Sequence, residues 1–465
     1  MSAVAAGAPV AARTRSRAWV VILLCWLIVV LDGYDLIVYG TTLAHVMAEP
    51  GWGLDPASAG FLGSLVFVGA LFGSLGAGDI ADRLGRRGTI LACTLLFTVC
   101  TAAIGLAPNR EVFGVLRLLA GIGLGGLIPS ANAMTAEFVS VRHRSAVSTI
   151  MMSGVPIGGT TAALLGLVML PQPGWRSMYL LAGVGLVLVA VIWFIMPESP
   201  TWLHSRGRHE EARAVASRWG ISDLVESARR PLADTEVATP AEASGESLSP
   251  RPRGLAALAS RENRAPAILF SLASITTLFT WYGLGTWLPK LMGSDAHFAS
   301  LMANPLVFLV SLNIGAVIGS IVTAWAGIRF GPLPSAIVAS VLAAAGLAFL
   351  LTQPGDAAAV NMALVFAGIG THGTQCLVLA AIANSFRDEL RGTALGFASG
   401  MGRIGAIAAP QLGGLLLASS AGVAGNFVMF ASAAALSALV LLLTALTLGK
   451  GRRHPHESPA ARSRR

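Results

Sequence analysis

Long uninterrupted apolar runs constrain the fold of this 465-residue chain more than any other feature of its sequence. Hydrophobic residues make up 54% of the chain and charged residues 12%, whereas soluble domains carry about 25% charged residues. Many runs approach or exceed about 18 residues, so each can cross a hydrocarbon core of about 30 Å as one α-helix. Strands of a membrane barrel would alternate apolar and polar residues instead. We therefore expect an all-α membrane protein embedded in a lipid bilayer.

Twelve transmembrane helices are expected, separated by turn residues or clustered charges. Their approximate limits are residues 18–40, 58–78, 88–107, 111–137, 146–170, 175–196, 265–289, 303–326, 333–352, 359–384, 393–417 and 424–448. One long polar segment, residues 197–264, separates the sixth span from the seventh. This layout predicts two six-helix bundles, at 18–196 and 265–448, joined by a cytoplasmic linker at 197–264. Residues 1–17 and 449–465 form cytoplasmic tails, the second of them basic.

The linker contains two kinds of sequence. Its middle, from Pro231 to Arg253, is rich in Pro, Ser, Ala and Glu and is predicted to be disordered. Its first part, from Arg206 to Trp219, predicts a short interfacial helix because its apolar residues recur at helical spacing. These residues are Ala212, Val215, Ala216 and Trp219.

The positive charges indicate the membrane topology. The net charge of +9 lies in loops and tails between the apolar runs, so it does not point to nucleic acid as a partner. Most of the 32 lysines and arginines fall in the two tails, the linker and alternate loops, which marks those segments as cytoplasmic. We expect both termini on the cytoplasmic side.

The two halves of the chain share sequence features. Gly158 and Gly405 follow corresponding arginines at the same distance in the two halves. The corresponding segments are Arg83-Leu84-Gly85 with Arg329-Phe330-Gly331, and Arg144-Ser145-Ala146 with Arg391-Gly392-Thr393. Such an internal repeat is typical of transporters built from two bundles.

Two carboxylates interrupt the first apolar run. Asp32 and Asp35 are spaced i,i+3 and share a helix face, to which Tyr39 lies close. A charge inside the membrane costs at least about 2.5 kcal/mol. Two nearby carboxylates repel, so such a pair can take up a proton near neutral pH and return it. We predict that Asp32 and Asp35 couple transport to protons; the alternative is that they are helix-terminal acids facing water.

Two arginines also lie inside apolar runs. Arg117 is roughly 10 Å deep in span four, about the level of the acids, and Arg403 is roughly 18 Å past Arg391 in span eleven. A buried guanidinium needs an anion, which for Arg117 is either the aspartates or a substrate carboxylate. A planar guanidinium fork suits a carboxylate, so both arginines are candidate substrate ligands. The alternative is a fixed structural pair for either of them.

Polar and aromatic residues in the second half are further candidates for the substrate pocket. His372 and Gln375 share a face of span ten, where His372 can relay protons, contact substrate or simply pack. Asn313 in span eight and the pair Trp281-Tyr282 in span seven are possible pocket residues. Tyr39 is a candidate in the first half. Aromatic rings can stack on a ring substrate, although packing or interfacial anchoring explains them equally well.

Three stretches resemble known signatures. Gly78-Asp79-Ile80-Ala81-Asp82-Arg83-Leu84-Gly85-Arg86-Arg87 resembles the loop 2–3 signature of the major facilitator superfamily. Pro197-Glu198-Ser199-Pro200-Thr201-Trp202-Leu203 is similar to a signature of its sugar-porter-like members. Asp32-Gly33-Tyr34-Asp35, together with Arg117 to Gly126, resembles the aromatic acid:proton symporter branch. The resemblance covers nearly the whole chain except the linker and tails, and it implies the major facilitator fold and a bacterial inner (plasma) membrane.

The resemblance also implies an inner gate. Asp82 would cap the N-terminus of a facing helix, and Glu137 would pair with Arg142, Arg144 or the arginines of 83–87. The expected gating residues are Asp79, Asp82, Arg83, Arg86, Glu137, Arg144 and Arg391. The alternative is positive-inside charge with a tight turn at Gly85. Ile328 stands where the second half would need a matching Asp, so a symmetric gate is not expected.

Taken together, these features predict a proton-coupled symporter that imports a small aromatic carboxylate, of the benzoate or hydroxybenzoate type, by alternating access. Its partners would be the aromatic acid, protons and the lipid bilayer, with no cofactor beyond the proton as coupling ion. A sugar or general metabolite:proton symporter of the same superfamily is the nearest alternative, and a membrane sensor or scaffold is another. No nucleophile–base arrangement or metal-ligand spacing is recognisable, so an enzyme is not expected.

Overall fold

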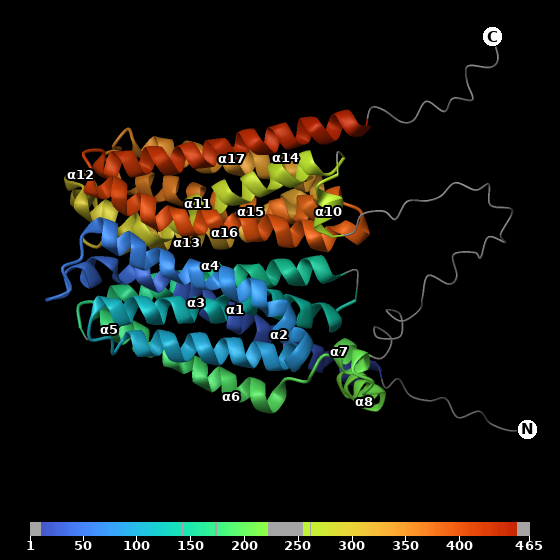
Figure 1. Cartoon of the computed structure of the whole chain (residues 1–465). Helices are drawn as coiled ribbons and strands as arrows, with labels where there is room; N and C mark the ends of the chain where they lie inside the picture. Colours follow the sequence, from blue (N-terminus) through green and yellow to red (C-terminus); the bar gives the residue numbers. More distant parts are fainter. Residues whose placement is uncertain (1–10, 141–142, 173, 222–253, 261, 453–465) are drawn as a thin grey trace, which may run out of the picture. The chain divides into compact units, whose positions relative to one another are not determined.

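The computed structural model describes residues 11–140, 143–172, 174–221, 254–260 and 262–452. All regular secondary structure in these ranges is helical, which confirms the predicted all-α class (Figure 1). The segment predicted to be disordered, Pro231 to Arg253, lies outside the described residues.

Within the described residues, eleven helical segments are long and apolar enough to cross a membrane. In the first half they are α1 (Ala11–Met47), α2 (Pro56–Ile104), α3 (Arg110–Glu137), α4 (Arg144–Met169), and α5 (Trp175–Leu181) continued by η2 (Ala182–Val184) and α6 (Gly185–Ile195). In the second half they are α11 (Arg264–Ser294), α13 (Leu306–Phe330), α14 (Pro332–Leu350), α15 (Ala357–Ser385), α16 (Asp388–Ala418) and α17 (Gly422–Arg452). Shorter helices are α7 (Pro200–Ser205), α8 (His209–Trp219), α10 (Leu255–Leu258) and α12 (Ala296–Leu301).

Helix α2 accounts for the difference between eleven segments and twelve predicted spans. It is 49 residues long, and Gly85 within it has φ 84° and ψ 169°, which is not a helical conformation. A helix of this length would reach about 74 Å, more than twice the thickness of the hydrocarbon core. The segment therefore contains the predicted second and third spans, before and after Gly85.

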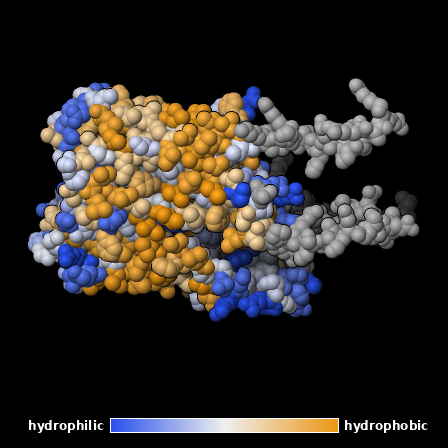
Figure 2. Space-filling model, turned by 45° about the horizontal axis from the view of Figure 1, so that its top comes forward, coloured by the Kyte–Doolittle hydropathy of each residue, from blue (hydrophilic) through white to orange (hydrophobic). Residues whose placement is uncertain are grey.

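The apolar surface of the spans fits a lipid environment. Large apolar side chains are exposed along their outer faces; Leu75 is 73% and Val168 is 72% exposed. In Figure 2, apolar side chains dominate the middle of the visible face, and hydrophilic ones gather at its ends. Extensive exposed apolar surface of this kind marks contact with a membrane.

The chain separates by contacts into two compact units. The first unit comprises Met1–Leu36, Val68–Gly158 and Arg176–Ser249, and the second comprises Ile37–Phe67, Gly159–Trp175 and Pro250–Arg465. The predicted bundle limits remain a prediction, because several boundaries of this division fall inside helices, among them α1, α2 and α4.

The second unit is built around α11 and α15. Helix α11 packs against α16 and α17, and α15 packs against α13 and α14. The first-half segments of this unit also pack closely on these helices. A Cβ added to Gly40 would lie 1.9 Å from the main-chain oxygen of Gly285, and Ser64 donates a hydrogen bond of 2.7 Å to the oxygen of Ile407. Parts of α1 and α2 are thus held against α11 and α16.

The internal repeat predicted from the sequence is present in the backbone. Gly331, between α13 and α14, has φ 91° and ψ 149°, nearly the conformation of Gly85. Only glycine adopts such positive φ values readily, which explains why both segments end on it. The helix crossings repeat as well. A Cβ on Gly158 would lie 2.0 Å from the oxygen of Val30, and one on Gly405 would lie 2.0 Å from the oxygen of Ile275.

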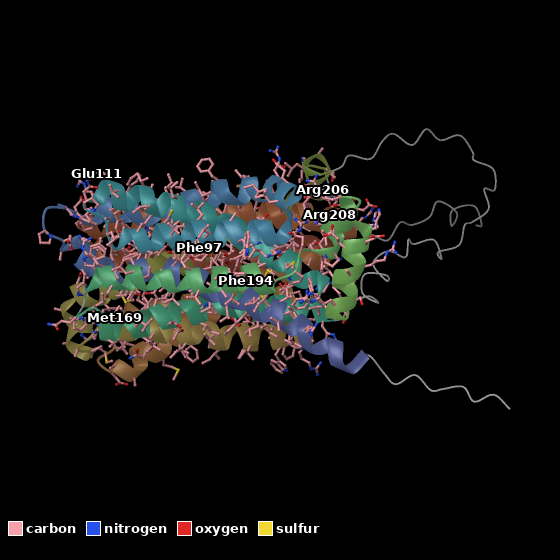
Figure 3. The ribbon with its side chains drawn as sticks, turned by 90° about the horizontal axis from the view of Figure 1, so that it is seen from below. Phe97, Glu111, Met169, Phe194, Arg206 and Arg208 are labelled. Carbon is pink, nitrogen blue, oxygen red and sulfur yellow. The ribbon has the colours of Figure 1, made fainter. Side chains whose placement is uncertain are left out.

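The predicted interfacial helix is present as α8. Three residues of its apolar stripe, Ala212, Ala216 and Trp219, are buried. Trp219 packs edge-on against Phe138 at the end of α3, with ring centroids 6.0 Å apart. Gly220 ends the helix in the left-handed conformation. Figure 3 shows Arg206 and Arg208 at the end of the first unit where α7 and α8 lie, and Glu111 at the other end. The stripe thus packs at least partly on the protein.

Candidate functional site

The two acids of α1 are buried in the first unit. Asp32 and Asp35 are each 2% exposed. Removing a carboxylate from water is costly unless opposite charge and hydrogen bonds compensate for it. The surroundings of these acids therefore determine when either of them can be ionised.

Three helical segments meet at Asp35. The hydroxyl of Thr101, in the second part of α2, donates a hydrogen bond to Oδ1 of Asp35. The guanidinium of Arg117 on α3 is 2% exposed and attracts the Asp35 carboxylate electrostatically. The similar depth expected for Arg117 and the acids thus agrees with the structure, and the interaction stabilises the ionised form of Asp35.

The residues between the two acids fasten α1 to its neighbours. A Cβ on Gly33 would lie 2.1 Å from the oxygen of Val155, so α4 approaches α1 as closely as glycine allows. The hydroxyl of Tyr34 donates to the main-chain oxygen of Met178 on α5 at 2.7 Å. The order Asp-Gly-Tyr-Asp therefore combines two acids with the contacts that hold their helix in place.

Thr101 and Tyr34 are site residues that sequence reasoning did not single out. A signal for Thr101 was available, since Thr94, Thr98 and Thr101 are spaced i, i+4 and i+7 within an apolar run. All three are 0% exposed and form a polar stripe on one face of the helix. Tyr34 carried no such signal, because its partner is a main-chain oxygen in another span.

Tyr39 lies in the second unit and is 1% exposed. Its hydroxyl donates a hydrogen bond of 2.6 Å to the main-chain oxygen of Ala59 near the start of α2. In this structure the hydroxyl therefore joins two helices, and its role in substrate binding remains a prediction.

The predicted pocket residues Trp281, Tyr282, Asn313, His372 and Gln375 are each buried in the second unit. The rings of Trp281 on α11 and His372 on α15 have centroids 5.2 Å apart. Tyr282 packs on Phe67 of α2 with centroids 4.5 Å apart. This side-chain set combines aromatic rings with an imidazole at mid-span.

Two predicted pocket residues of this unit, like Gln411 and Asn426, have a buried amide oxygen with no hydrogen-bond donor among the described residues. Asn313 is 0% exposed; its Nδ2 donates to the oxygen of Leu309 at 2.9 Å, whereas its Oδ1 accepts nothing. Oε1 of Gln375 is likewise buried without a donor. A buried acceptor left unpaired costs about 1–3 kcal/mol. Oδ1 of Asn313 lies against α4, 2.2 Å from where a Cβ on Gly159 would be, so the substrate contacts expected for Asn313 and Gln375 remain a prediction.

Arg403 is partly buried on α16 in the second unit. A Cβ on the neighbouring Gly402 would lie 2.8 Å from the side chain of Leu278, so this stretch of α16 lies against α11. The acids and Arg117 belong to the first unit. The shared cavity expected for Arg403, Arg117 and the acids remains a prediction.

The gating roles remain a prediction, and the structure gives contacts for some of the residues expected to fill them. Asp79, Asp82 and Arg83 are exposed. The main-chain oxygen of Asp82 accepts a hydrogen bond of 2.9 Å from Nε1 of Trp202 and one of 2.7 Å from Nη2 of Arg206. The helix cap predicted for its carboxylate is not formed among the described residues. Arg86 is partly buried, and Arg391 is exposed near the start of α16.

Glu137 differs from the prediction more clearly. Its carboxylate accepts hydrogen bonds of 2.7 Å from the hydroxyl of Ser199 and of 3.2 Å from the main-chain amide of Thr201, at the start of α7. The predicted pairing with Arg144 or with an arginine of 83–87 is not formed among the described residues, where hydroxyl and main-chain donors at the start of α7 contact both oxygens. Arg144 instead donates to the oxygen of Ala136 at 3.0 Å, and Arg142 lies outside the described residues.

Glu198 is a further structural acid that the sequence did not distinguish within its motif. Its Oε1 accepts hydrogen bonds of 3.0 Å from the main-chain amide of Arg87 and of 2.9 Å from the main-chain amide of Ser199. Together with Glu137, it fastens α7 to the turn at Gly85 and to the end of α3. The two signature segments noted in the sequence are therefore parts of one cluster.

A buried acid and arginine within repeated apolar spans define a class of protein, the secondary transporter. Residues 25–318 and 270–465 match the Major Facilitator Superfamily, and the chain belongs to this superfamily of transporters. It is accordingly a transporter and not an enzyme.

Curated relatives span nearly the same length. The chain is 44% identical over 423 residues to a gentisate transporter of Corynebacterium glutamicum, covering 90% of this chain and 86% of the relative. It is 34% identical to a benzoate transport protein of Acinetobacter baylyi, covering 86% and 83%. It is 32% identical to the 4-hydroxybenzoate transporter PcaK of Pseudomonas aeruginosa, covering 93% and 92%.

Solved structures agree on the fold. The partially occluded inward open conformation of the xylose transporter XylE from E. coli matches with a TM-score of 0.71 and 15% identity, covering 92% of this chain and 99% of that one. Its inward open conformation matches with a TM-score of 0.70 and 17% identity, covering 91% and 96%. The chain therefore has the major facilitator fold of two six-helix bundles.

Proposed function

We propose that this protein is a proton-coupled symporter that imports a small aromatic carboxylate of the benzoate or hydroxybenzoate type. The observation that carries the proposal is the buried Asp35 carboxylate, which has a threonine donor and an arginine as its stabilising partners. The aromatic acids named for the gentisate, benzoate and 4-hydroxybenzoate transporters support the substrate class.

Competition for Arg117 provides the coupling. While the site is empty, the guanidinium stabilises the ionised Asp35. A substrate carboxylate that binds Arg117 takes over this counter-charge, and ionised Asp35 becomes costly in a site that is 2% exposed. Asp35 then takes up a proton, so that substrate and proton occupy the protein together. Asp32, one turn earlier, holds or passes the same proton.

The second half supplies the remaining contacts of the substrate. Trp281 and His372 offer ring faces, and the oxygens of Asn313 and Gln375 accept hydrogen bonds from ring hydroxyls. Arg403 would offer a second guanidinium, Tyr282 a further ring, and Tyr39 a contact from the first half. These roles fit an amphiphilic ring with a carboxylate at one edge.

The end of the first unit that carries α7 and α8 would face the cytoplasm. The arginine-rich turn lies on this side together with α7 and α8, the first part of the linker, which agrees with the positive-inside distribution. Both termini are then cytoplasmic, and the membrane is the inner membrane of a bacterium.

Uptake into proteoliposomes tests the proposal. Labelled benzoate, 4-hydroxybenzoate, gentisate and xylose are compared with and without an inward proton gradient. We expect gradient-driven accumulation of at least one aromatic acid and none of xylose. Asp35→Asn should abolish accumulation while leaving exchange of bound substrate intact, because the neutral amide mimics the protonated acid. Accumulation of xylose alone, or full accumulation by Asp35→Asn, contradicts the proposal.

A further inference from the structure

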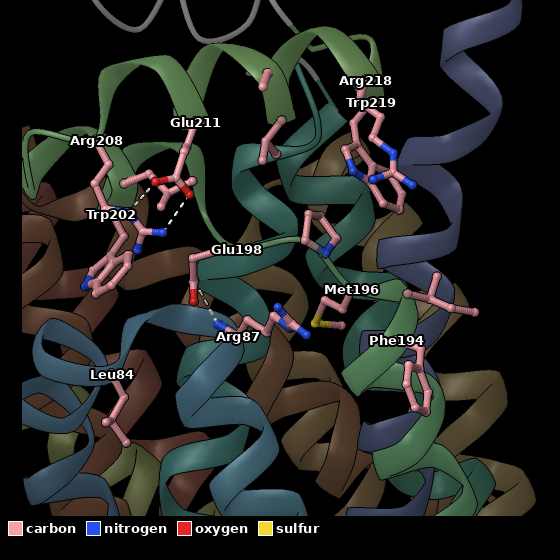
Figure 4. Close-up of a pocket in the computed structure, with 15 residues that line it drawn as sticks. Leu84, Arg87, Phe194, Met196, Glu198, Trp202, Arg208, Glu211, Arg218 and Trp219 are labelled. Carbon is pink, nitrogen blue, oxygen red and sulfur yellow. Dashed lines mark hydrogen bonds and ion pairs between the residues drawn. The ribbon is translucent and has the colours of Figure 1, made fainter.

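A cavity of about 530 Å³ lies in the first unit, away from the acids of α1. Its walls come from the turn after the first part of α2, the end of α6, and helices α7 and α8. Figure 4 shows Arg87, Glu198, Arg208, Glu211 and Arg218 around it. Three guanidinium groups and two carboxylates thus line one space.

Both carboxylates are already engaged. Glu211 accepts two hydrogen bonds from Arg208, at 2.7 and 2.6 Å, and this interaction lowers the pKa of Glu211. Glu198 accepts the main-chain amides of Arg87 and Ser199. Glu198 therefore fixes the turn by accepting hydrogen bonds from main-chain amides rather than by pairing with a guanidinium.

Two arginines remain with no ion pair among the described residues, namely Arg87 and Arg218. The guanidinium of Arg87 lies 5.7 Å over the ring of Trp193 and donates through Nη2 to the Trp193 oxygen. Its Nε is buried and has no acceptor among the described residues. A guanidinium that is held in place and lines the cavity without an ion pair can receive an anion there.

The edge of the cavity is strongly apolar. Trp193, Phe194 and Ile195 form the last turn of α6 and are 60%, 83% and 47% exposed, and Leu84 across the cavity is 55% exposed. They end a span that crosses the membrane, so they lie near the level where acyl chains meet headgroups. A ligand at this place would have an anionic head and an apolar body.

We propose that this cavity binds the phosphate of an anionic phospholipid from the leaflet at the α7–α8 end, with Arg87 and Arg218 as its ligands. Arginine suits the planar, multiple hydrogen bonds of a phosphate, and the exposed residues of α6 accommodate the acyl chains. A soluble phosphate shares the headgroup chemistry but gains nothing from the apolar edge. The bound lipid would hold α7 and α8 against the turn at Gly85.

Native mass spectrometry of the purified full chain tests this site. The protein is titrated with phosphatidylglycerol, with phosphatidylcholine, and with glycerol 3-phosphate as the soluble phosphate. Arg87→Gln, Arg218→Gln and the double variant are compared with Arg213→Gln, which removes the same charge from an exposed position of α8 that does not line the cavity. Melting temperatures confirm that each variant is folded.

We expect tight retention of one phosphatidylglycerol by the wild type, weakened about tenfold by each single cavity variant and further by the double variant. Arg213→Gln should bind as the wild type does, and phosphatidylcholine should bind weakly. Equal loss in Arg213→Gln would mean general surface charge and overturn the proposal. Full competition by glycerol 3-phosphate would assign the site to soluble phosphates instead, and unchanged binding in the double variant would remove it. Arg218→Gln keeps the test valid if changes at Arg87 unfold the turn.

Discussion

The contact between Gly40 on α1 and Gly285 on α11 leads to a quantitative prediction about alternating access. A Cβ at position 40 would lie 1.9 Å from the Gly285 oxygen and 2.9 Å from its carbonyl carbon. Real Cβ contacts are essentially never shorter than 3.0 Å, so the helices must separate by at least the difference of 1.1 Å. Both neighbouring atoms belong to the main chain, so no side-chain rotation can relieve the clash.

Gly40→Ala should therefore destabilise the conformation in which α1 and α11 touch, rather than unfold the protein. Overpacking of this kind costs about 1–3 kcal/mol, which corresponds to a shift of about 5- to 140-fold against the closed contact. In a transporter with two access states, the cost falls on the state in which these helices touch. The protein then spends more time open at this end, and transport slows.

Labelling of a single cysteine measures the shift. Thr286→Cys is introduced next to the contact in a chain whose four native cysteines have been replaced. Thr286 is 4% exposed, so a maleimide reaches the new thiol only when the helices separate. We expect Gly40→Ala to raise the labelling rate by roughly the predicted population shift.

Two matched alanine substitutions distinguish separation of α1 from α11 from a general loss of stability. A Cβ on Gly405 meets the Ile275 oxygen at 2.0 Å, but this crossing joins two second-half helices. Gly405→Ala should lower the melting temperature without faster labelling. Gly396, with nothing within 4 Å of an added Cβ, should tolerate alanine in both assays. Wild-type labelling and melting in Gly40→Ala would refute the reasoning.

Three further predictions follow from the polar contacts. Thr101→Val removes the donor to Asp35 and should reduce proton-driven accumulation, with little change in substrate affinity; unchanged accumulation would contradict the role of this hydroxyl. Arg403→Ala should weaken substrate binding by at least about tenfold in an equilibrium binding assay, and Arg403→Lys by less, whereas equal affinities would remove Arg403 from the site. Glu137→Gln weakens the contact with Ser199 and Thr201 and should cost about 1.5–3 kcal/mol, seen as a lower melting temperature, whereas Glu210→Gln on the exposed start of α8 should not.

The spans and the repeat were predictable because they depend on long apolar runs and on glycine. Each run must satisfy its own backbone in lipid, which leaves the helix as the only solution. Gly85 and Gly331 could be paired from sequence, since both turns require a conformation that other residues avoid. The length of α2 was not predictable, because the extent of helix on either side of Gly85 depends on packing.

The partners of individual side chains were only partly predictable. Arg117 could be placed near the acids from depth alone, since helical rise converts residue number into position. Glu137 was assigned to an arginine because opposite charges suggest a pair. Its actual partners are a hydroxyl and an amide on α7, whose position depends on the tertiary structure.

The turn at Gly85 depends on a residue made much later in synthesis. A Cβ at position 85 would lie 2.3 Å from Oε2 of Glu198, so this carboxylate lies directly against the turn. Glu198 follows the last span of the first half, more than a hundred residues downstream. The second and third spans can therefore insert early, but their connection reaches its final contacts only after the ribosome has passed α7. The linker thus completes the first repeat during biosynthesis, although it belongs to neither half.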